Sequence, residues 1–159
     1  MKTHTLVGLV VAFCISCKCE GTSSIKVLID NQSGYDIVIL SYKDGITTIN
    51  NTTLKSTTIT MPNKSEKLLI NTGGRGKGNG WVGPFSFVDS LVIVFHSSKK
   101  AAHYFNNITG KNPNALLTNN PRSLFNEDSY VRKTIIDNKC YLETDFVYTF
   151  TKQDYLNAK

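Results

Sequence analysis

The sequence predicts an all-β fold: an antiparallel β-sandwich, Ig-like or transthyretin-like in form, with one short helical turn. Asn, Thr, Ser and Gly are abundant and only 19% of the 159 residues are charged. This composition favours strands and turns, because Asn, Ser and Gly weaken helices and Thr is β-branched. Short apolar segments recur between clusters of turn-forming residues, with no helical segment between them. Residues 141–151 alternate with a period of two, which is typical of a half-buried strand.

The first half of the expected domain contains five strands. We expect 35–42 to be an inner strand, because both of its faces are apolar, and the Thr-rich segments 46–50 and 57–61 to lie at edges. Turn-forming clusters such as Asp44-Gly45 separate the segments. The expected strands are residues 25–29, 35–42, 46–50, 57–61 and 66–71.

The second half contains the most apolar strand, residues 90–95. A glycine-rich loop, 73–80, precedes it, and residues 106–121 form a polar surface loop without periodicity. We expect the short helical turn within 123–130. The segments expected to complete the sandwich are residues 101–105, 132–136 and 141–151.

The N-terminus has the pattern of an export signal. A single Lys2 precedes the apolar run 6–15. A run of this length is too short for a bilayer, which needs about 20 residues, but it matches the hydrophobic region of a signal peptide. We therefore expect residues 1–16 to be a signal peptide, 17–24 a lipidated tether and 25–159 a single domain, whose size is ordinary for one domain.

Cys17 is the expected lipid-attachment residue. It follows Ile15-Ser16, an aliphatic and a small residue, which resembles the bacterial lipobox. Cys14 stands where that motif usually has Leu. Ordinary cleavage that leaves a secreted soluble or periplasmic protein is the alternative. Lipidation of Cys17 would leave Cys19 and Cys140 available to pair in an oxidising compartment, and the sequence leaves open whether they do.

Several short segments of the chain are distinctive when taken together: residues 31–35, the Gly-Lys-Gly loop, 84–95, 126–130 and 148–155. This combination resembles small uncharacterised lipoproteins of Bacteroidota. The resemblance covers most of the expected domain and implies a lipid anchor but no activity.

No catalytic or cofactor motif is evident. The loop 73–80 lacks the GxxxxGK[ST] pattern of a phosphate-binding loop, so we interpret it as a basic connecting loop. His96 and His103 flank the segment 97–100, and a hairpin with Lys99-Lys100 at its tip would place them opposite each other. Two histidines are too few for a stable metal site, so we expect no metal and no cofactor. The candidate carboxylates are Glu127, Asp128, Glu143 and Asp145; we interpret them as helix-turn and strand-surface residues.

The remaining candidates are aromatic and basic residues. Aromatic side chains could build a platform for a sugar or peptide, although core and rim packing is the favoured interpretation. The formal net charge is +6, but the basic residues are scattered, so we expect no nucleic-acid partner. The aromatic candidates are Tyr35, Tyr42, Trp81, Tyr104 and Tyr141.

The leading hypothesis is a lipoprotein of the bacterial cell envelope, bound to the membrane through its N-terminal lipid. We expect its sandwich to be a binding or interaction module for an unknown protein or glycan ligand, and not an enzyme. The alternatives are an inhibitor or immunity-type protein that blocks a partner through a sheet edge, and an envelope hydrolase that uses His96 or His103.

Overall fold

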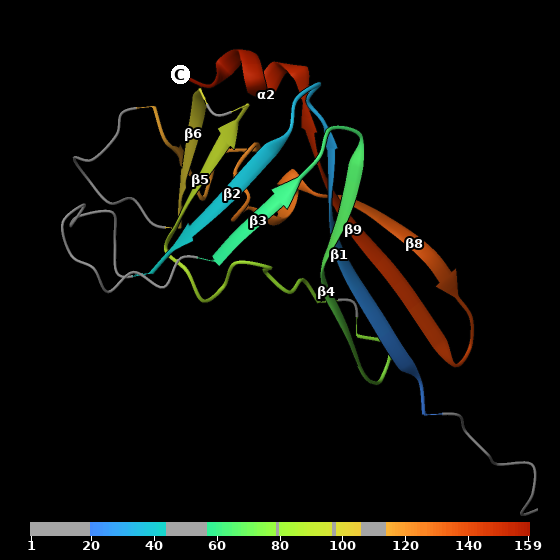
Figure 1. Cartoon of the computed structure of the whole chain (residues 1–159). Helices are drawn as coiled ribbons and strands as arrows, with labels where there is room; N and C mark the ends of the chain where they lie inside the picture. The colour runs from blue at the N-terminus through green and yellow to red at the C-terminus, as the bar shows by residue number, and fades with distance from the viewer. Residues whose placement is uncertain (1–19, 44–56, 79, 97, 106–113) are drawn as a thin grey trace, which may run out of the picture.

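The computed structural model of the chain describes residues 20–43, 57–78, 80–96, 98–105 and 114–159. Within these ranges two packed β-sheets make up most of the fold (Figure 1). The four-stranded sheet has the order β4-β1-β9-β8, and the five-stranded sheet has the order β3-β2-β5-β6-β7. The predicted β-sandwich is therefore confirmed.

The strands of the four-stranded sheet are β1 (Thr22–Gln32), β4 (Ser65–Arg75), β8 (Val131–Asp137) and β9 (Tyr141–Thr151). The five-stranded sheet contains β2 (Ile37–Tyr42), β3 (Thr57–Met61), β5 (Ser90–Phe95), β6 (Lys99–Tyr104) and β7 (Leu116–Leu117). A 3-10 turn, η2 (Glu127–Ser129), lies within the predicted helical turn. The C-terminal helix α2 (Lys152–Asn157) was not expected.

The sequence suggested a purely antiparallel sandwich, but two of the strand pairs are parallel. Strand β1 pairs with β9 in parallel, from Thr22 opposite Tyr141 to Gln32 opposite Thr151, and β7 runs parallel to β6. Parallel neighbours need a long connection, and here all of the five-stranded sheet lies between β1 and β9 in the sequence. Turn residues reveal hairpins but not such distant pairings.

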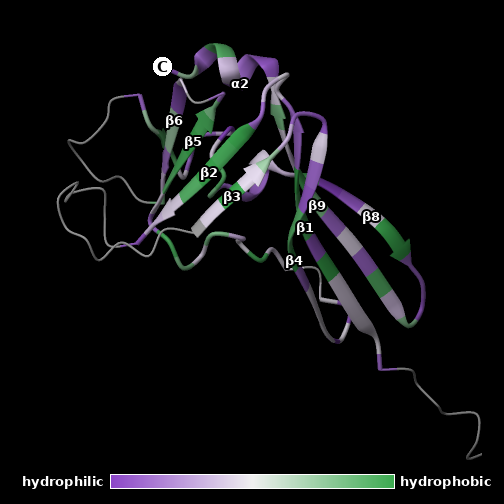
Figure 2. Cartoon of the chain, viewed as in Figure 1, coloured by the Kyte–Doolittle hydropathy of each residue, from purple (hydrophilic) through white to green (hydrophobic). Residues whose placement is uncertain are grey.

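The strand positions follow the predicted pattern closely. Strand β2 lies between β3 and β5, as expected of an inner strand, and β3 is an edge. Figure 2 shows strong hydrophobic colour on β2 and β5, in the middle of the five-stranded sheet. The predicted segment 46–50 and Cys17 lie outside the described residues.

Two boundaries differ from the expectation. Residues 22–24, expected in the tether, already belong to β1. Strand β4 continues through Gly73 and Gly74 to Arg75, where a loop was expected. A Cβ on Gly73 would lie 3.0 Å from the Ser23 carbonyl oxygen. Glycine therefore lets the two backbones pair closely at this point.

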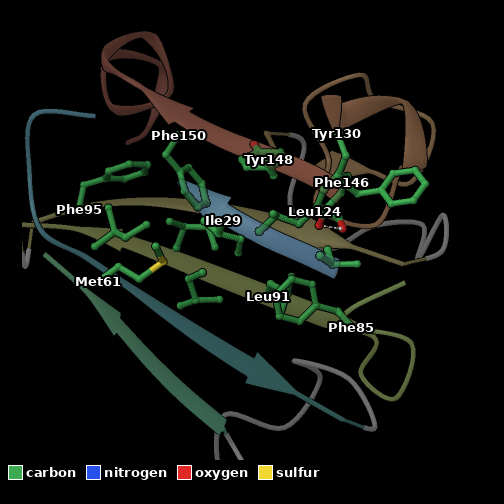
Figure 3. Close-up of a cluster of buried hydrophobic side chains, with 14 of the residues drawn as sticks. Ile29, Met61, Phe85, Leu91, Phe95, Leu124, Tyr130, Phe146, Tyr148 and Phe150 are labelled. Carbon is green, nitrogen blue, oxygen red and sulfur yellow. Dashed lines mark hydrogen bonds between the residues drawn. The ribbon is translucent and has the colours of Figure 1, made fainter. Parts of the chain in front are cut away.

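The core lies between the two sheets (Figure 3). Alternate residues of β1 and β9 face it, so Val27, Ile29 and Phe146 are buried against Leu91 and Phe95 of β5. The rings of Phe95 and Phe150 meet edge to face at 6.0 Å between centroids. The four-stranded sheet extends past the five-stranded sheet toward the N-terminus, and α2 lies at the opposite end (Figure 1).

Candidate functional site

A cavity of about 350 Å³ lies at the α2 end of the sandwich. It lies between β6, the last residues of β9, the segment 114–122 and the C-terminal residues 154–159. Its size falls within the range of small-molecule binding sites, roughly 300–1,000 Å³. The apolar part of its wall includes Phe95, Ala101, Leu116, Tyr148 and Phe150.

His103 is the most deeply buried polar residue of this wall, with 1% of its surface exposed. It pairs with Leu91 of β5 and therefore shares the inner face of the sheet with that core residue. Its Nδ1 accepts a hydrogen bond from the Leu124 N–H at 3.1 Å. In the neutral ring the proton must then be on Nε2. Among the described residues, the structure records no hydrogen-bond partner for Nε2.

The His103 imidazole stays neutral at physiological pH. Burial lowers its pKa to about 3, and the Arg122 charge adds to the decrease, while Asp154 opposes it. The ring is thus a fixed N–H donor at the cavity. It is not placed as the base of a catalytic triad, because that role needs an Nδ1–H directed at a carboxylate and an unprotonated Nε2.

Arg122 forms the second polar element of the wall. Its Nε donates to Asp154 Oδ1 at 3.0 Å, and its Nη2 donates to Asp154 Oδ2 at 2.5 Å and to the Thr149 carbonyl at 2.8 Å. The guanidinium also lies over the Tyr148 ring, 4.6 Å from its centroid. Such a two-point ion pair with aromatic stacking fixes the plane of an arginine better than a single contact does.

Helix α2 begins at this ion pair. Asp154 Oδ2 accepts hydrogen bonds from both the backbone N–H and the hydroxyl of Thr151, at 2.7 and 2.9 Å. This is the arrangement of a capping box. On its other side, Tyr155 stacks on Tyr35 with 3.9 Å between ring centroids. The carboxylate of Asp154 therefore joins the start of the helix to the cavity wall.

The C-terminal residues complete the wall. Lys159 and Lys100 exchange two backbone hydrogen bonds of 3.1 and 2.7 Å, so the end of the chain pairs with β6. The Lys159 ammonium donates to Asn114 Oδ1 at 2.7 Å. Buried Ala158 packs into the core. These contacts bring both lysines to the cavity.

The histidine hairpin predicted from the sequence is wrong. Phe95 pairs with Lys99, so Lys99 and Lys100 belong to β6 and are not the tip of the hairpin. His96 adopts a positive φ of 44° in this turn and faces Tyr35 at 6.0 Å between ring centroids. His103 lies at the other end of β6. Within the described residues, no three His, Cys, Asp or Glu side chains are close enough to share a metal ion.

The five aromatic candidates are not brought together in one cleft. Trp81 packs against Tyr130 and Phe146, whereas Tyr35 packs against Tyr155. Tyr104 is buried. In the part of the chain that the structure describes, no ring contact joins any two of the five.

The carboxylate candidates are also dispersed. Glu127 and Asp128 lie in η2, while Glu143 forms a 2.5 Å ion pair with Lys26 on the outer face of the four-stranded sheet. In the glycine-rich segment, Lys77 pairs with Asp137 at 2.7 Å. The positions of these carboxylates agree with their interpretation as helix-turn and strand-surface residues.

Sequence reasoning singled out His103 but missed Arg122, Asp154 and the two lysines around it. One signal was available, since Thr151-Lys152-Gln153-Asp154 has the spacing of a capping box and marks a helix start. No local pattern links Arg122 to that helix.

Cys140 is disulfide-bonded. The Thr22 N–H donates to the Cys140 carbonyl at 2.9 Å, which places the start of β1 beside it. In the same described ranges, no helix is long and apolar enough to cross a membrane.

Comparison with known proteins assigns no family. No family model matches the chain, and no curated protein matches it. A solved structure, titled "NMR structure of the protein from Eubacterium rectale", aligns with 79% of this chain and 87% of its own at 13% identity, with a TM-score of 0.23. Similarity at this level supports no conclusion about fold or function.

Proposed function

We propose that this chain is an exported lipoprotein of the bacterial cell envelope and that its sandwich binds a small ligand in the cavity beside α2. The observation that supports binding most directly is the buried His103, whose Nε2–H has no recorded partner within the described residues at a cavity of ligand size. A ligand acceptor at this position would pair with the His103 N–H.

The anchor part of the proposal is supported by the signal-like N-terminus and Cys17. The start of β1 lies at the far end of the molecule from α2 (Figure 1). A lipid attached shortly before β1 would therefore leave the cavity directed away from the membrane, where it is open to soluble ligands.

Fatty-acid labelling in a bacterial host tests the anchor. Wild-type protein should incorporate an alkyne fatty acid and Cys17→Ala should not, whereas Cys14→Ala should retain the label as the matched control. Equal labelling of Cys17→Ala and wild type would contradict the anchor.

A cavity-filling substitution tests the binding site. Ala101 lies on the inner face of β6 and lines the cavity, so Ala101→Phe should occupy the space a ligand needs. Fragments that bind the wild type in saturation-transfer NMR should fail to bind this variant, while Ile135→Ala on β8 should keep them. Fragments that bind Ala101→Phe equally well, or a library without any hits on the wild type, would contradict the proposal.

A second candidate function is an inhibitor that pairs a sheet edge with its target. Strand β8 favours it, because all seven of its residues are exposed and it is an edge of the four-stranded sheet. Such an edge offers free backbone donors and acceptors to a partner strand. Thr134→Pro in β8 should abolish capture of such a partner without affecting the fragments bound in the cavity.

A further inference from the structure

The cavity wall has more positive than negative side-chain charge. Arg122 and Lys159 line it, and Asp154 is its acidic side chain. Lys100 pairs with Val94, so its side chain lies on the outer face of the sheet and its backbone borders the cavity. The Arg122–Asp154 pair is neutral as a unit, so Lys159 leaves a net positive wall.

Hydrogen-bond donors at this wall also exceed acceptors. Arg122 has five N–H groups, of which Nε and Nη2 bind Asp154 and Thr149. For Nη1 the structure records no partner among the described residues. His103 adds the Nε2–H, and it cannot act as an acceptor there because Nδ1 receives the Leu124 N–H. A complementary ligand therefore presents acceptor oxygens.

The cavity lining also has an apolar part. Phe95 and Phe150 belong to the core and contact each other edge to face, and Leu116 of β7 lines the same space. A fully ionic ligand such as a free phosphate would leave this surface uncovered. An organic acid with an aromatic or aliphatic body would bury it, at roughly 25 cal/mol per Å² of apolar area.

We infer that the ligand of this cavity is a small organic carboxylate, whose acid group faces Arg122, Lys159 and the His103 N–H and whose apolar body packs on Phe95, Leu116 and Phe150. This inference rests on the proposed binding function and specifies its ligand class. Arg122 is held in place before a ligand arrives, by Asp154 on one edge and Tyr148 beneath its plane. Such pre-organisation favours planar, two-oxygen acceptors.

The test compares three probes that share one body: phenylacetate, phenylacetamide and phenethylamine, titrated into the full domain by NMR. Phenylacetate should shift the Leu124 amide and His103 ring resonances and bind about tenfold more tightly than the amide, because hydrogen bonds to charged groups are the stronger ones. The amine should not bind. Lys159→Gln should weaken phenylacetate binding about threefold, as expected for a partly exposed ion pair.

Matched controls distinguish failure of the proposed ligand class from failure of the proposed binding site. Lys133→Gln removes the same charge from the exposed strand β8 and should leave the affinity for phenylacetate unchanged. If the amide binds in the cavity as tightly as the acid, the ligand class is wrong and the binding site stands. If inorganic phosphate competes as strongly as phenylacetate, the assignment to carboxylates is likewise overturned. If no probe perturbs Leu124 or His103 at millimolar concentration, the ligand class and the binding function both fall.

Discussion

The two ends of the sandwich differ in how their strands are held. At the α2 end the last part of β9 places Tyr148 and Phe150 in the core, and Arg122, Asp154 and His103 line the same cavity. At the projecting end the neighbouring strand β8 has no buried residue. Strand pairing, the Lys26–Glu143 and Lys77–Asp137 ion pairs and the Cys140 disulfide hold this end.

The α2 end therefore contains most of the stabilising contacts and the candidate binding site, whereas the projecting end mainly lengthens the molecule. Side-chain burial, the largest favourable contribution to folding, is concentrated where the sheets overlap and where the cavity lies. The projecting end depends mainly on backbone hydrogen bonds and a covalent link. Substitutions at the two ends should therefore have very different effects on the free energy of unfolding.

The largest effect should come from Phe146→Ala. Phe146 is 2% exposed and packs against Trp81 at 5.2 Å between ring centroids. Loss of a buried Phe leaves a cavity and costs about 3–5 kcal/mol. Urea unfolding should show this decrease, and a loss below about 1 kcal/mol, the range of ordinary substitutions, would contradict the importance of overlap.

The disulfide of Cys140 should contribute next. Cys19 is the cysteine nearest to Thr22, which contacts Cys140, so peptide mapping without reduction should recover a Cys19–Cys140 linkage. Cys140→Ser should lower the free energy of unfolding by about 2–4 kcal/mol, and the wild type under reducing conditions should lose the same amount. A Cys17–Cys140 linkage would contradict both this pairing and lipidation of Cys17.

The buried imidazole predicts a dependence of stability on pH. The folded-state pKa of His103, about 3, lies below its ordinary value of 6.5. Between these values the unfolded chain binds a proton that the folded chain does not. Stability should therefore be fully present above pH 6.5 and should fall as the pH is lowered toward 3, by about 1.4 kcal/mol per pH unit from this group.

Thermal unfolding between pH 4.5 and 7 measures this dependence. His103→Gln should flatten the slope, and His96→Gln in the exposed turn should not. An unchanged slope in His103→Gln would show that other groups cause the acid sensitivity.

The smallest effect should follow substitution on β8. Ile135 is 53% exposed and lies at the irregularity between Thr134 and Ile136, so Ile135→Ser should change the free energy of unfolding by less than about 0.5 kcal/mol. Urea unfolding at neutral pH checks it. A cost as large as that of Phe146→Ala would mean that this face is covered in solution and would remove the contrast between the two ends.

The sequence predicts the strands well because their pattern is local. Residues 141–151 alternate with period two and form β9 with those same bounds, and the apolar run 90–95 forms β5. The cavity could not be predicted in this way. His103, Arg122 and Asp154 come from separate segments, and their meeting depends on the hairpin register of β6 and on where α2 folds back. The pairing of Phe95 with Lys99, where the sequence had suggested a tip at Lys99-Lys100, was enough to separate the two histidines.

The parallel pairing of β1 with β9 has a consequence for the order of assembly. In the contact between Thr22 and Cys140, 118 residues separate the two partners in sequence, and β1 and β9 are the two central strands of their sheet. A nascent chain that has not yet released its last strand lacks half of that centre, and such distant contacts make folding slow. Polypeptide emerging from a ribosome or a translocation channel would thus remain unfolded until nearly all of it is through, which would be compatible with the export proposed above.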